Sequence, residues 1–370
     1  MKDLKPIWSD NYVVISATSS NEYVPYLSVY LESIKSNTDE KTNYDVVILE
    51  KSITNDNKKI LKDFFEEKPN LSLRFYNPSE LFLVSNLIVS HNYLCQESYY
   101  RLAAPLIFKN YKRLIFTDLD LIFNKNPKEL FNKDMQGAPI LSVLEPIWSN
   151  WINKNASVSS VNIIEYSQKI LKLSDCHHYF NTGVMLMDIE QLNSRNISPQ
   201  MIEKLSNGVK YLYQDQDVLN EMLASEMGIL PWEWNNEILG SKTLDIANDF
   251  FKTYCDSNDK PGIIHWIGPN KPWKETTRQY AYLWWQYARK TPYYEIILLR
   301  MMNTSSINQQ IQTLTDQIHD PLSFSKNILK YWRYKIMEKI MFGKKKEHYA
   351  NKKQVWEEKI RIDKQLRGGK

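Results

Sequence analysis

The chain has 370 residues, of which 43% are hydrophobic, and a net charge of +4; this is enough for one large domain with an appendage, or for two domains. Its three cysteines, Cys95, Cys176 and Cys255, form no Cys-x-x-Cys pair, which argues against a disulfide framework and a thiolate zinc site and favours a reduced, cytosolic setting. The chain shows no basic-then-apolar leader, and its apolar run Leu81–Val89 is far shorter than the roughly 18 residues of a membrane span.

Strand and helix patterns alternate along the first 116 residues. Apolar or alternating runs predict strands over residues 12–17, 45–49, 71–76 and 113–116, and helical apolar spacing predicts helices over residues 24–36, 53–66 and 99–108. Thr54 is expected to cap the second of these helices. The alternation implies an α/β fold with a largely parallel sheet and helices on both faces.

The rhythm changes after residue 120. Residues 144–181 show few clear elements, although they contain Trp148 and Trp151. Further on, buried strands are predicted over residues 184–188 and 261–266, and a helix over residues 218–224. Beyond Lys274 the pattern is helical and rich in aromatic residues, with no internal repeat and no low-complexity linker.

Two aspartates, Asp118 and Asp120, stand one residue apart directly after the predicted strand 113–116. The chain bends at a strand end, so both carboxylates can point into the crevice where α/β sheets bind ligands. Two carboxylates there are costly without a positive partner, and a hard divalent cation that bridges phosphates is the natural one. The alternative is a solvated turn in which the aspartates only favour the turn.

Three further segments carry polar residues in a fixed order: Tyr179–Val184, Asp215–Asn220 and His265–Trp273. Together with Asp118-Leu119-Asp120, their order and spacing resemble glycosyltransferase family 8. The resemblance covers residues 11–275 and implies a GT-A fold, a Rossmann-like, mostly parallel central sheet with flanking helices. It also implies a retaining, metal-dependent enzyme that transfers galactose or glucose from a UDP-sugar.

The resemblance implies that Asp118, Asp120 and His265 ligate the metal ion, Mn²⁺ or Mg²⁺, and that Leu119 belongs to the nucleotide-binding segment. The chemistry suits these residue types, because negative charge grows on the β-phosphate as UDP leaves and a divalent ion stabilises it. Carboxylates with one imidazole suit Mn²⁺. Without the resemblance, a lone histidine in this apolar context would be interpreted as a packed core residue.

The family pattern also implies contacts to the diphosphate. Gly268 has no Cβ, so the backbone can approach a phosphate closely, and Lys271 supplies a point charge. Arg101 matches a family arginine that approaches the donor; the alternative is a charge on the surface of a helix.

Contacts to the donor sugar are implied for Asn181, Asp215 and Gln216. Asn181 would contact the sugar, the alternative being a turn-forming asparagine before glycine. Asp215 is expected to bond the sugar hydroxyls and Gln216 to lie near the anomeric carbon, which makes these two the catalytic candidates. Asp217 is interpreted as an N-cap for the helix that follows.

One departure from the family pattern concerns the loop after the first strand. Family members often carry an Asp/Asn-rich stretch there that contacts uracil and ribose, whereas this chain has serines in its place. Ala17, Thr18 and Ser20 are the candidates for the nucleotide contacts of this loop.

Retention of configuration requires either a covalent double displacement or a front-face route, in which the departing phosphate helps to deprotonate the acceptor on the same side. The amide of Gln216 is a poor nucleophile compared with a carboxylate. We therefore favour the front-face route, with Gln216 stabilising oxocarbenium character electrostatically.

Two other functions are compatible with parts of the pattern. An NDP-sugar nucleotidyltransferase shares the scaffold and the metal carboxylates, but it should show a Gly- and Lys/Arg-rich phosphate loop, and Thr18–Tyr23 contains no glycine. A non-catalytic sugar- or membrane-binding relic should lack Asp118, Asp120 or His265, and all three are present.

The C-terminal segment differs in charge from the rest of the chain. Residues 326–370 hold 15 basic and 5 acidic residues, a net charge of +10, which leaves −6 on residues 1–325 because the whole chain carries +4. An apolar stripe at helical spacing accompanies these charges: Ile328, Leu329, Trp332, Ile336, Met337, Ile340 and Met341.

We therefore expect residues 1–275 to form the catalytic domain and residues 276–370 a helical, basic and aromatic region. The basic helix is predicted to dock on an anionic membrane surface or, alternatively, to pack on the catalytic domain; nucleic acid is not an expected partner. The expected location is cytoplasmic, peripheral to the inner membrane face. Capsule, lipopolysaccharide or lipid-linked glycans fit that location as acceptors, and a glycoprotein glycan is an alternative.

Overall fold

The computed structural model describes residues 3–82, 96–206, 209–239, 261–303, 326–341 and 343–366. Cys95, Cys255 and all but the first two residues of the run Leu81–Val89 lie outside these ranges. The contacts within the chain divide it into two compact units, residues 1–295 and residues 296–370. Among the described residues, no helix is long and apolar enough to cross a membrane.

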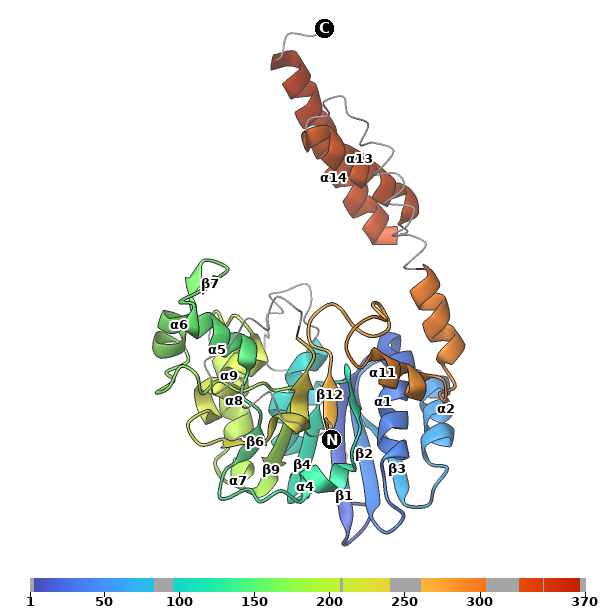
Figure 1. Cartoon of the computed structure of the whole chain (residues 1–370), viewed down its shortest axis with the longest axis vertical. Coiled ribbons are helices and arrows are strands. Elements are labelled where there is room, and N and C mark those ends of the chain that lie inside the picture. The colour runs from blue at the N-terminus through green and yellow to red at the C-terminus, as the bar shows by residue number, and fades with distance from the viewer. Residues whose placement is uncertain are drawn as a thin grey trace. The chain divides into compact units, whose positions relative to one another are not determined.

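A seven-stranded sheet forms the centre of the first unit, with the strand order β10-β6-β9-β4-β1-β2-β3 (Figure 1). Its strands are β1 Tyr12–Ser19, β2 Asn43–Glu50, β3 Leu71–Tyr76, β4 Arg113–Thr117, β6 Ile140–Ser142, β9 Val184–Asp188 and β10 Gly228–Ile229. The pairs β3-β2, β2-β1, β1-β4 and β6-β10 are parallel, and β9 runs antiparallel to both β4 and β6. The sheet is therefore mostly parallel, as predicted, with β9 reversed.

A small second sheet brings a distant segment to the end of β4. It contains β11 Asn236–Glu237, β12 Ile263–His265 and β5 Leu121–Phe123, in the order β11-β12-β5. Strand β12 runs antiparallel to β5 and places His265 opposite Leu121. The histidine thereby reaches the residues that directly follow β4. A separate hairpin pairs β7 Ser157–Val158 with β8 Val161–Asn162.

Helices flank the sheet and connect its strands. In the first unit they are α1 Val24–Ser36, α2 Asn55–Phe65, α3 Ala104–Ile107, α4 Pro127–Phe131, α5 Pro146–Asn153, α6 Ile163–Lys169, α7 Ile189–Ser194, α8 Ile197–Ser206, α9 Gln214–Leu223 and α11 Ala281–Ala288. Short 3₁₀ helices are η1 Asn21–Tyr23, η2 Ser79–Phe82, η3 Gln96–Ala103 and η4 Trp232–Asn235. Thr54 caps α2 as predicted, because its side chain accepts a hydrogen bond from the Asn57 N–H.

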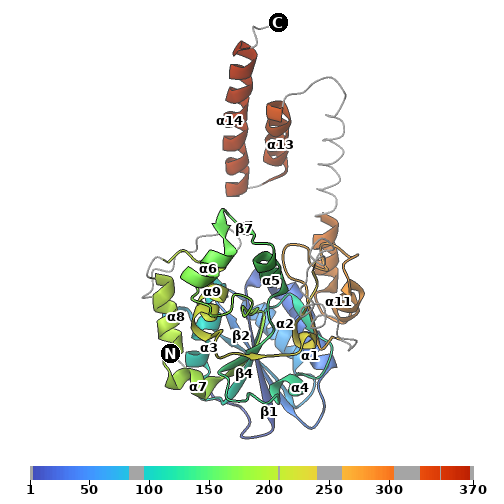
Figure 2. The ribbon, with the colours of Figure 1, turned by 60° about the vertical axis from the view of Figure 1, so that its left-hand side comes forward.

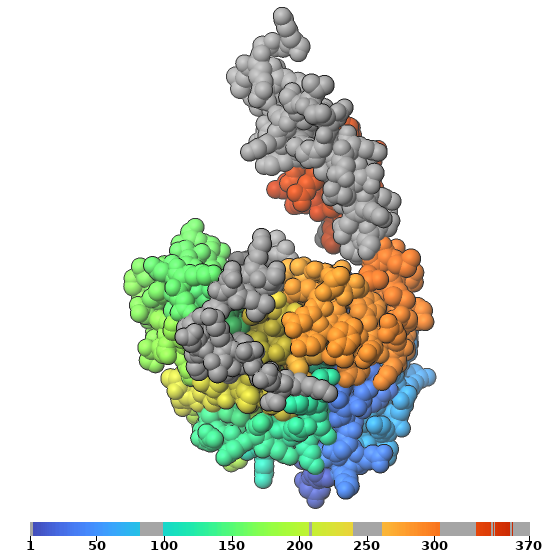
Figure 3. Space-filling model, in the orientation of Figure 1, coloured from blue at the N-terminus to red at the C-terminus, as the bar shows by residue number. Residues whose placement is uncertain are grey.

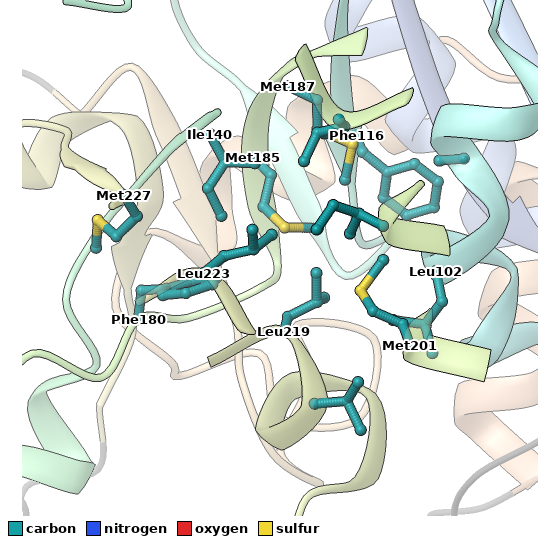
Figure 4. Packing of buried hydrophobic residues seen from close by; sticks show 14 of the residues in the cluster. Leu102, Phe116, Ile140, Phe180, Met185, Met187, Met201, Leu219, Leu223 and Met227 are labelled. Carbon is teal, nitrogen blue, oxygen red and sulfur yellow. The ribbon is translucent and has the colours of Figure 1, made fainter. Parts of the chain in front are cut away.

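The sheet separates two hydrophobic cores, and alternate residues of each strand point to opposite ones. In β4, Phe116 belongs to the core shared with α3, α7, α8 and α9, whereas Ile115 belongs to the core shared with α1 and α2. Figure 4 shows Met185 and Met187 of β9 gathered with Phe116 and with Leu219 of α9 in the first of these cores. Helices on both faces therefore bury the strands, which explains their continuous apolar runs.

Two predicted helices differ from the structure. Residues 99–108 were predicted as one helix, but the chain forms the 3₁₀ helix η3 and then the short α3. Pro105 lies in the first turn of α3, where its missing N–H is tolerated, and this favours a helix that begins next to it rather than running through it. Helix α9 begins at Gln214 rather than at Val218, so Asp215 and Gln216 lie inside its first turn.

Residues 276–295 belong to the first compact unit, which thus extends beyond the predicted boundary at 275. Helix α11 lies beside α1 (Figure 2), and the orange segment after residue 261 lies against the blue N-terminal segment in Figure 3. Aromatic rings join them: Tyr26 stacks on Trp273 at 4.2 Å between ring centroids, and Trp273 lies 5.2 Å from Trp284. The Tyr293 hydroxyl also donates to Asn57 Oδ1 at 2.7 Å.

The second unit contains two helices, α13 Lys326–Ile340 and α14 Gly343–Leu366, which pack on each other. Tyr334 and Tyr349 face one another at 6.3 Å, and Lys353 Nζ donates to Glu338 Oε2 at 2.7 Å. The predicted C-terminal helices are therefore present as a helical pair.

Candidate active site

The two aspartates lie where β4 ends at the carboxyl edge of the sheet. The Asp118 N–H donates to the Gly183 carbonyl at 2.8 Å, and the Asp120 carbonyl accepts from the Trp266 N–H at 3.0 Å. Thr117, the last residue of β4, is buried and its hydroxyl bonds the Tyr30 hydroxyl at 2.7 Å. These bonds hold the bend that turns both carboxylates out of the strand.

Asp118, Asp120 and His265 together form a cluster that could hold a metal ion, with one ligand atom from each residue lying within 4.8 Å of the others. His265 Nε2 lies 3.0 Å from Asp120 Oδ1 and 3.9 Å from Asp118 Oδ2. Two carboxylates and one imidazole form a donor set that suits a divalent ion such as Mn²⁺. The residues present therefore fit the ion that the sequence predicted.

A chain of side-chain amides determines which nitrogen of His265 carries a proton. The Gly183 N–H can only donate, so the atom of Asn181 that receives it at 2.7 Å is the oxygen, Oδ1. That oxygen also receives Asn235 Nδ2 at 3.0 Å, so the Asn235 oxygen faces His265 Nδ1 at 2.9 Å. Nδ1 must therefore be protonated, which leaves Nε2 as the nitrogen available to a metal ion.

Gly183 itself has a steric role under the histidine. A Cβ at this position would lie 2.4 Å from His265 Cε1 and 2.9 Å from Nδ1. His265 is 2% exposed, so its ring has little space to move away. Glycine is required here because the imidazole lies directly on the backbone.

Two basic side chains neutralise the aspartates: Lys271 pairs with Asp120, and Arg101 pairs with Asp118. Lys271 Nζ forms an ion pair with Asp120 and donates to the Trp266 carbonyl at 2.6 Å. Burial would raise the pKa of Asp120, but Lys271 and His265 together lower it well below its usual range. Asp120 is therefore ionised at any physiological pH.

Arg101 joins Asp118 to the start of α9. Its Nη2 donates to Asp118 Oδ1 at 2.6 Å, its Nε to Asp215 Oδ2 at 2.8 Å, and its Nη1 to the Thr182 carbonyl at 2.9 Å. Burial alone would lower the pKa of Arg101, but the two carboxylates outweigh it and raise the pKa. Burial raises the pKa of Asp215 to about 6 even though Arg101 opposes that shift. Arg101 is thus a buried ion-pair residue and not a charge on a helix surface.

Helix α9 presents Gln216 to the site and holds Asp217 behind it. Gln216 Oε1 accepts from both the N–H and the hydroxyl of Thr182, at 3.1 and 3.2 Å. Asp217 is fully buried and accepts hydrogen bonds of 2.7 Å from the hydroxyls of Tyr166 and Tyr179 and from a backbone N–H. The interpretation of Asp217 as an N-cap was therefore wrong, because α9 begins before it and its carboxylate is enclosed among tyrosines.

Comparison with known proteins identifies the family of this site. The sequence profile of glycosyl transferase family 8 matches residues 14–277. The chain belongs to glycosyltransferase family 8. The predictions of this family, of its GT-A fold and of a hexosyltransferase enzyme are confirmed.

Curated relatives share low identity over most of the family 8 region. General stress protein A of Bacillus subtilis strain 168 is 23% identical over 280 residues, 73% of this chain and 90% of that protein. The lipopolysaccharide glucosyltransferase WaaO of Escherichia coli K12 is 24% identical over 229 residues, 60% of this chain and 62% of that protein.

Solved structures share the fold. The apo structure of the bifunctional glycosyltransferase WbbM has a TM-score of 0.74 and 25% identity; it covers 81% of this chain, which spans about half (53%) of the WbbM chain. The galactosyltransferase LgtC in complex with donor and acceptor sugar analogs has a TM-score of 0.60 and 18% identity, covering 76% of this chain and 96% of that chain.

The remaining residues that the family 8 pattern singled out lie around the same edge. Ala17 pairs with Thr117 across β1 and β4, so Thr18 and Ser20 follow at the carboxyl end of β1. Gly268 has a φ of +73°, and a Cβ there would meet nothing within 4 Å. Glycine suits this position because the backbone is left-handed there, and not because a side chain would lack space.

A cavity of about 500 Å³ opens beside Gln216 and Gly268. Aromatic and aliphatic side chains dominate its walls, and Trp151 stacks on Tyr213 with ring centroids 6.0 Å apart and an interplanar angle of 17°. Asn181 and Gln216 line the same cavity. The cavity thus adjoins the residues that the family pattern associates with the donor sugar.

Sequence reasoning missed several residues of the site. Asn235 and Glu237 lie in a stretch without a motif, and no sequence signal marked them. Glu145 accepts from Asn181 Nδ2 at 2.7 Å, and burial raises its pKa and that of Glu237. Trp151 was visible only as an aromatic residue in an irregular stretch.

Proposed function

We propose that this family 8 enzyme transfers galactose or glucose from a UDP-sugar to a hydroxyl of a glycan acceptor, with retention of configuration and with a divalent metal ion, Mn²⁺ or Mg²⁺. The observation that carries the proposal is the cluster of Asp118, Asp120 and His265 beside Lys271, at the carboxyl ends of β1 and β4. The names of two relatives support the two hexoses as alternatives. One is the lipopolysaccharide glucosyltransferase WaaO, and the other is a lipopolysaccharide 1,3-galactosyltransferase of Salmonella typhimurium.

The proposal assigns the metal ion to Asp118, Asp120 and His265. When bound, a divalent ion supplies Lewis-acid stabilisation of the charge that develops on the leaving diphosphate. Lys271 adds a second positive charge at the same place, because its ammonium group already lies against Asp120. The Nδ1–H group of His265 donates to Asn235 Oδ1, and this hydrogen bond keeps the ring in one orientation during turnover.

The front-face route is supported by the hydrogen bonds of Gln216. Its Oε1 already accepts two hydrogen bonds from Thr182, which makes it a still weaker nucleophile than a free amide oxygen. In the proposed step the bond from the anomeric carbon to the diphosphate oxygen breaks while the acceptor oxygen bonds to the same face. The acceptor proton passes to the departing diphosphate oxygen. Asp215, fixed by Arg101 at 2.8 Å, would hold the hydroxyls of the donor sugar.

Release of UDP from a panel of nucleotide sugars tests this function. We expect turnover of UDP-galactose or UDP-glucose with Mn²⁺, loss of turnover in excess chelator, and recovery when Mn²⁺ is restored. Asp120→Asn should abolish turnover while a melting curve shows a folded protein. Asp134→Asn is a matched control, since Asp134 is exposed and caps a loop. Undiminished turnover in chelator would refute the proposal.

We further propose that the enzyme is cytoplasmic and that residues 326–370 dock it on the anionic inner face of the membrane. The segment carries a net charge of +10, and each engaged lysine or arginine contributes about 1 kcal/mol at such a surface. Trp332 is 37% exposed, and Lys335 Nζ lies 4.5 Å from the centroid of its ring, an arrangement that suits a headgroup layer.

Vesicle co-sedimentation tests the docking proposal. Full-length protein should bind anionic vesicles, bind them less as salt rises, and bind neutral vesicles only slightly, because a Debye length of about 8 Å screens exposed charges. A chain that ends at residue 303 should lose this binding. Equal binding of the two chains to anionic vesicles would contradict the proposal.

A further inference from the structure

The cavity beside Gln216 contains a positive charge that the described part of the chain does not neutralise. Arg278 lines this cavity, and its Nη2 donates to the Ile238 carbonyl at 2.6 Å. Its Nε is buried and has no hydrogen-bond partner. Among the described residues, no carboxylate lies within ion-pair distance of this guanidinium. An arginine normally satisfies its planar set of five donors with carboxylate, phosphate or carbonyl oxygens.

The other charged group in the cavity wall does not balance Arg278. Glu145 already receives Asn181 Nδ2 at 2.7 Å and the Ile147 N–H at 3.1 Å. Burial raises its pKa, which favours the neutral acid. The remaining walls are mainly apolar, so a charge beside them is weakly screened and a partner with opposite charge is bound more strongly than in water.

The same cavity offers a flat surface for a sugar ring. Trp151 and Tyr213 are half-buried and stacked, and Trp148 lies 6.2 Å from Trp151 in an edge-to-face arrangement. The apolar C–H face of a pyranose buries its surface well on such aromatic rings. The aromatic pair and the guanidinium therefore line one cavity that adjoins the proposed transfer site.

We propose that this cavity binds the acceptor, and that the acceptor carries a negatively charged group, a carboxylate or a phosphate, which pairs with Arg278. The proposal rests on the proposed function, because it names the acceptor class for the same site. The acidic group would accept hydrogen bonds from the guanidinium group of Arg278, which lines the cavity. The sugar ring would lie on Trp151 and Tyr213, with its hydroxyl directed to Gln216.

Three sugar probes distinguish the acidic groups. Methyl β-glucuronide supplies a carboxylate, glucose 6-phosphate supplies a phosphate, and methyl β-glucoside is the neutral reference. Binding is measured by saturation-transfer NMR on the full chain with saturating UDP and Mg²⁺, so that the diphosphate site is filled. At least one acidic probe should bind about tenfold more tightly than the neutral sugar, the effect of one charge-assisted hydrogen bond.

Two arginine variants locate the effect. Arg278→Met should bring the ratio of acidic to neutral affinity to about one, and Arg278→Lys should retain part of it. Arg113→Met is the matched control, because Arg113 also donates to backbone carbonyls but lies at the start of β4, away from the cavity; the preference should persist there. Melting curves show whether each variant is folded.

Several outcomes would overturn the proposal. They are equal affinity of the wild type for acidic and neutral sugars, no detectable binding of any probe, or a preference that survives Arg278→Met. The wild-type release of UDP without any acceptor is measured in parallel. If that release is metal-dependent while no acidic preference appears, the acceptor inference fails and the proposed function stands.

Discussion

Asn235 offers a sharp test of how the site holds its histidine. Replacing it by leucine keeps the side-chain size but removes the oxygen that accepts the His265 Nδ1 proton at 2.9 Å. A buried N–H without a partner costs about 1–3 kcal/mol. The carboxylate of Asp120 lies 3.0 Å from Nε2, so the neutral ring can avoid that cost by carrying its proton on Nε2 instead. That tautomer has no lone pair to offer a metal ion at Nε2.

The structure therefore predicts a loss of metal affinity in Asn235→Leu. A cost of about 1–3 kcal/mol corresponds to roughly a tenfold to hundredfold change in an equilibrium constant, and loss of partners that orient metal-binding histidines typically costs the same factor. Mn²⁺ affinity is measured by titration in the presence of UDP. The histidine tautomer is read by ¹⁵N NMR with UDP and Mg²⁺, with His265→Gln used to assign the signal.

Asn70→Leu is the matched control for this variant. Asn70 is also buried and lies just before β3, at the opposite end of the sheet. Its Nδ2 donates to the backbone carbonyls of Asp39 and Thr42. It should lose stability without losing Mn²⁺ affinity. An unchanged Mn²⁺ affinity in Asn235→Leu, with the proton still on Nδ1, would refute the tautomer argument.

Three other perturbations follow from the same geometry. Gly183→Ala should push the His265 ring aside and weaken Mn²⁺ binding, while a melting curve shows that the variant is folded; equal Mn²⁺ affinity of the variant and the wild type would contradict the close contact. Gln216→Ala should lower kcat more than it raises KM, because the proposed contact strengthens in the transition state, and a change in KM alone would make Gln216 a ground-state binding residue. Burial raises the pKa of Asp215 from 3.8 to about 6, so the folded protein retains a proton that the unfolded chain releases, and stability should fall as pH rises through that window. Asp215→Asn should remove this part of the pH dependence of the unfolding free energy in chelator, and an identical slope for both proteins would show that Asp215 is not its source.

The sequence predicted well those features that depend on local patterns. The apolar run of β4 followed by two aspartates identifies a strand end at the carboxyl edge of a parallel sheet, and the structure has that arrangement. Strand β12 could be predicted because Ile263 and Ile264 form an apolar pair in the sequence, and both side chains are buried in the structure. The family resemblance then linked His265 to the aspartates, a contact between residues 145 positions apart that no local pattern specifies.

Features that depend on long-range packing could not be predicted. Asn235 matters only because η4 brings it between Asn181 and His265. The burial of Asp217 follows from tyrosines of two other segments, whereas its sequence position after Gln216 suggests an ordinary helix cap. Arg278 lies beyond the last family motif, and its missing partner is visible only when the cavity walls are assembled.

The anomeric configuration of the first product tests the central proposal most directly. Wild-type protein is incubated with UDP-galactose or UDP-glucose and Mn²⁺, quenched with chelator, and analysed by proton NMR before the free sugar mutarotates. Because these donors are α-linked, metal-dependent transfer with retention predicts that the α-anomer of the released hexose appears first, and that none appears when chelator is present from the start. First appearance of the β-anomer, or release of hexose at the same rate in chelator, would contradict the proposal of a retaining, metal-dependent glycosyl transfer at Asp118, Asp120 and His265.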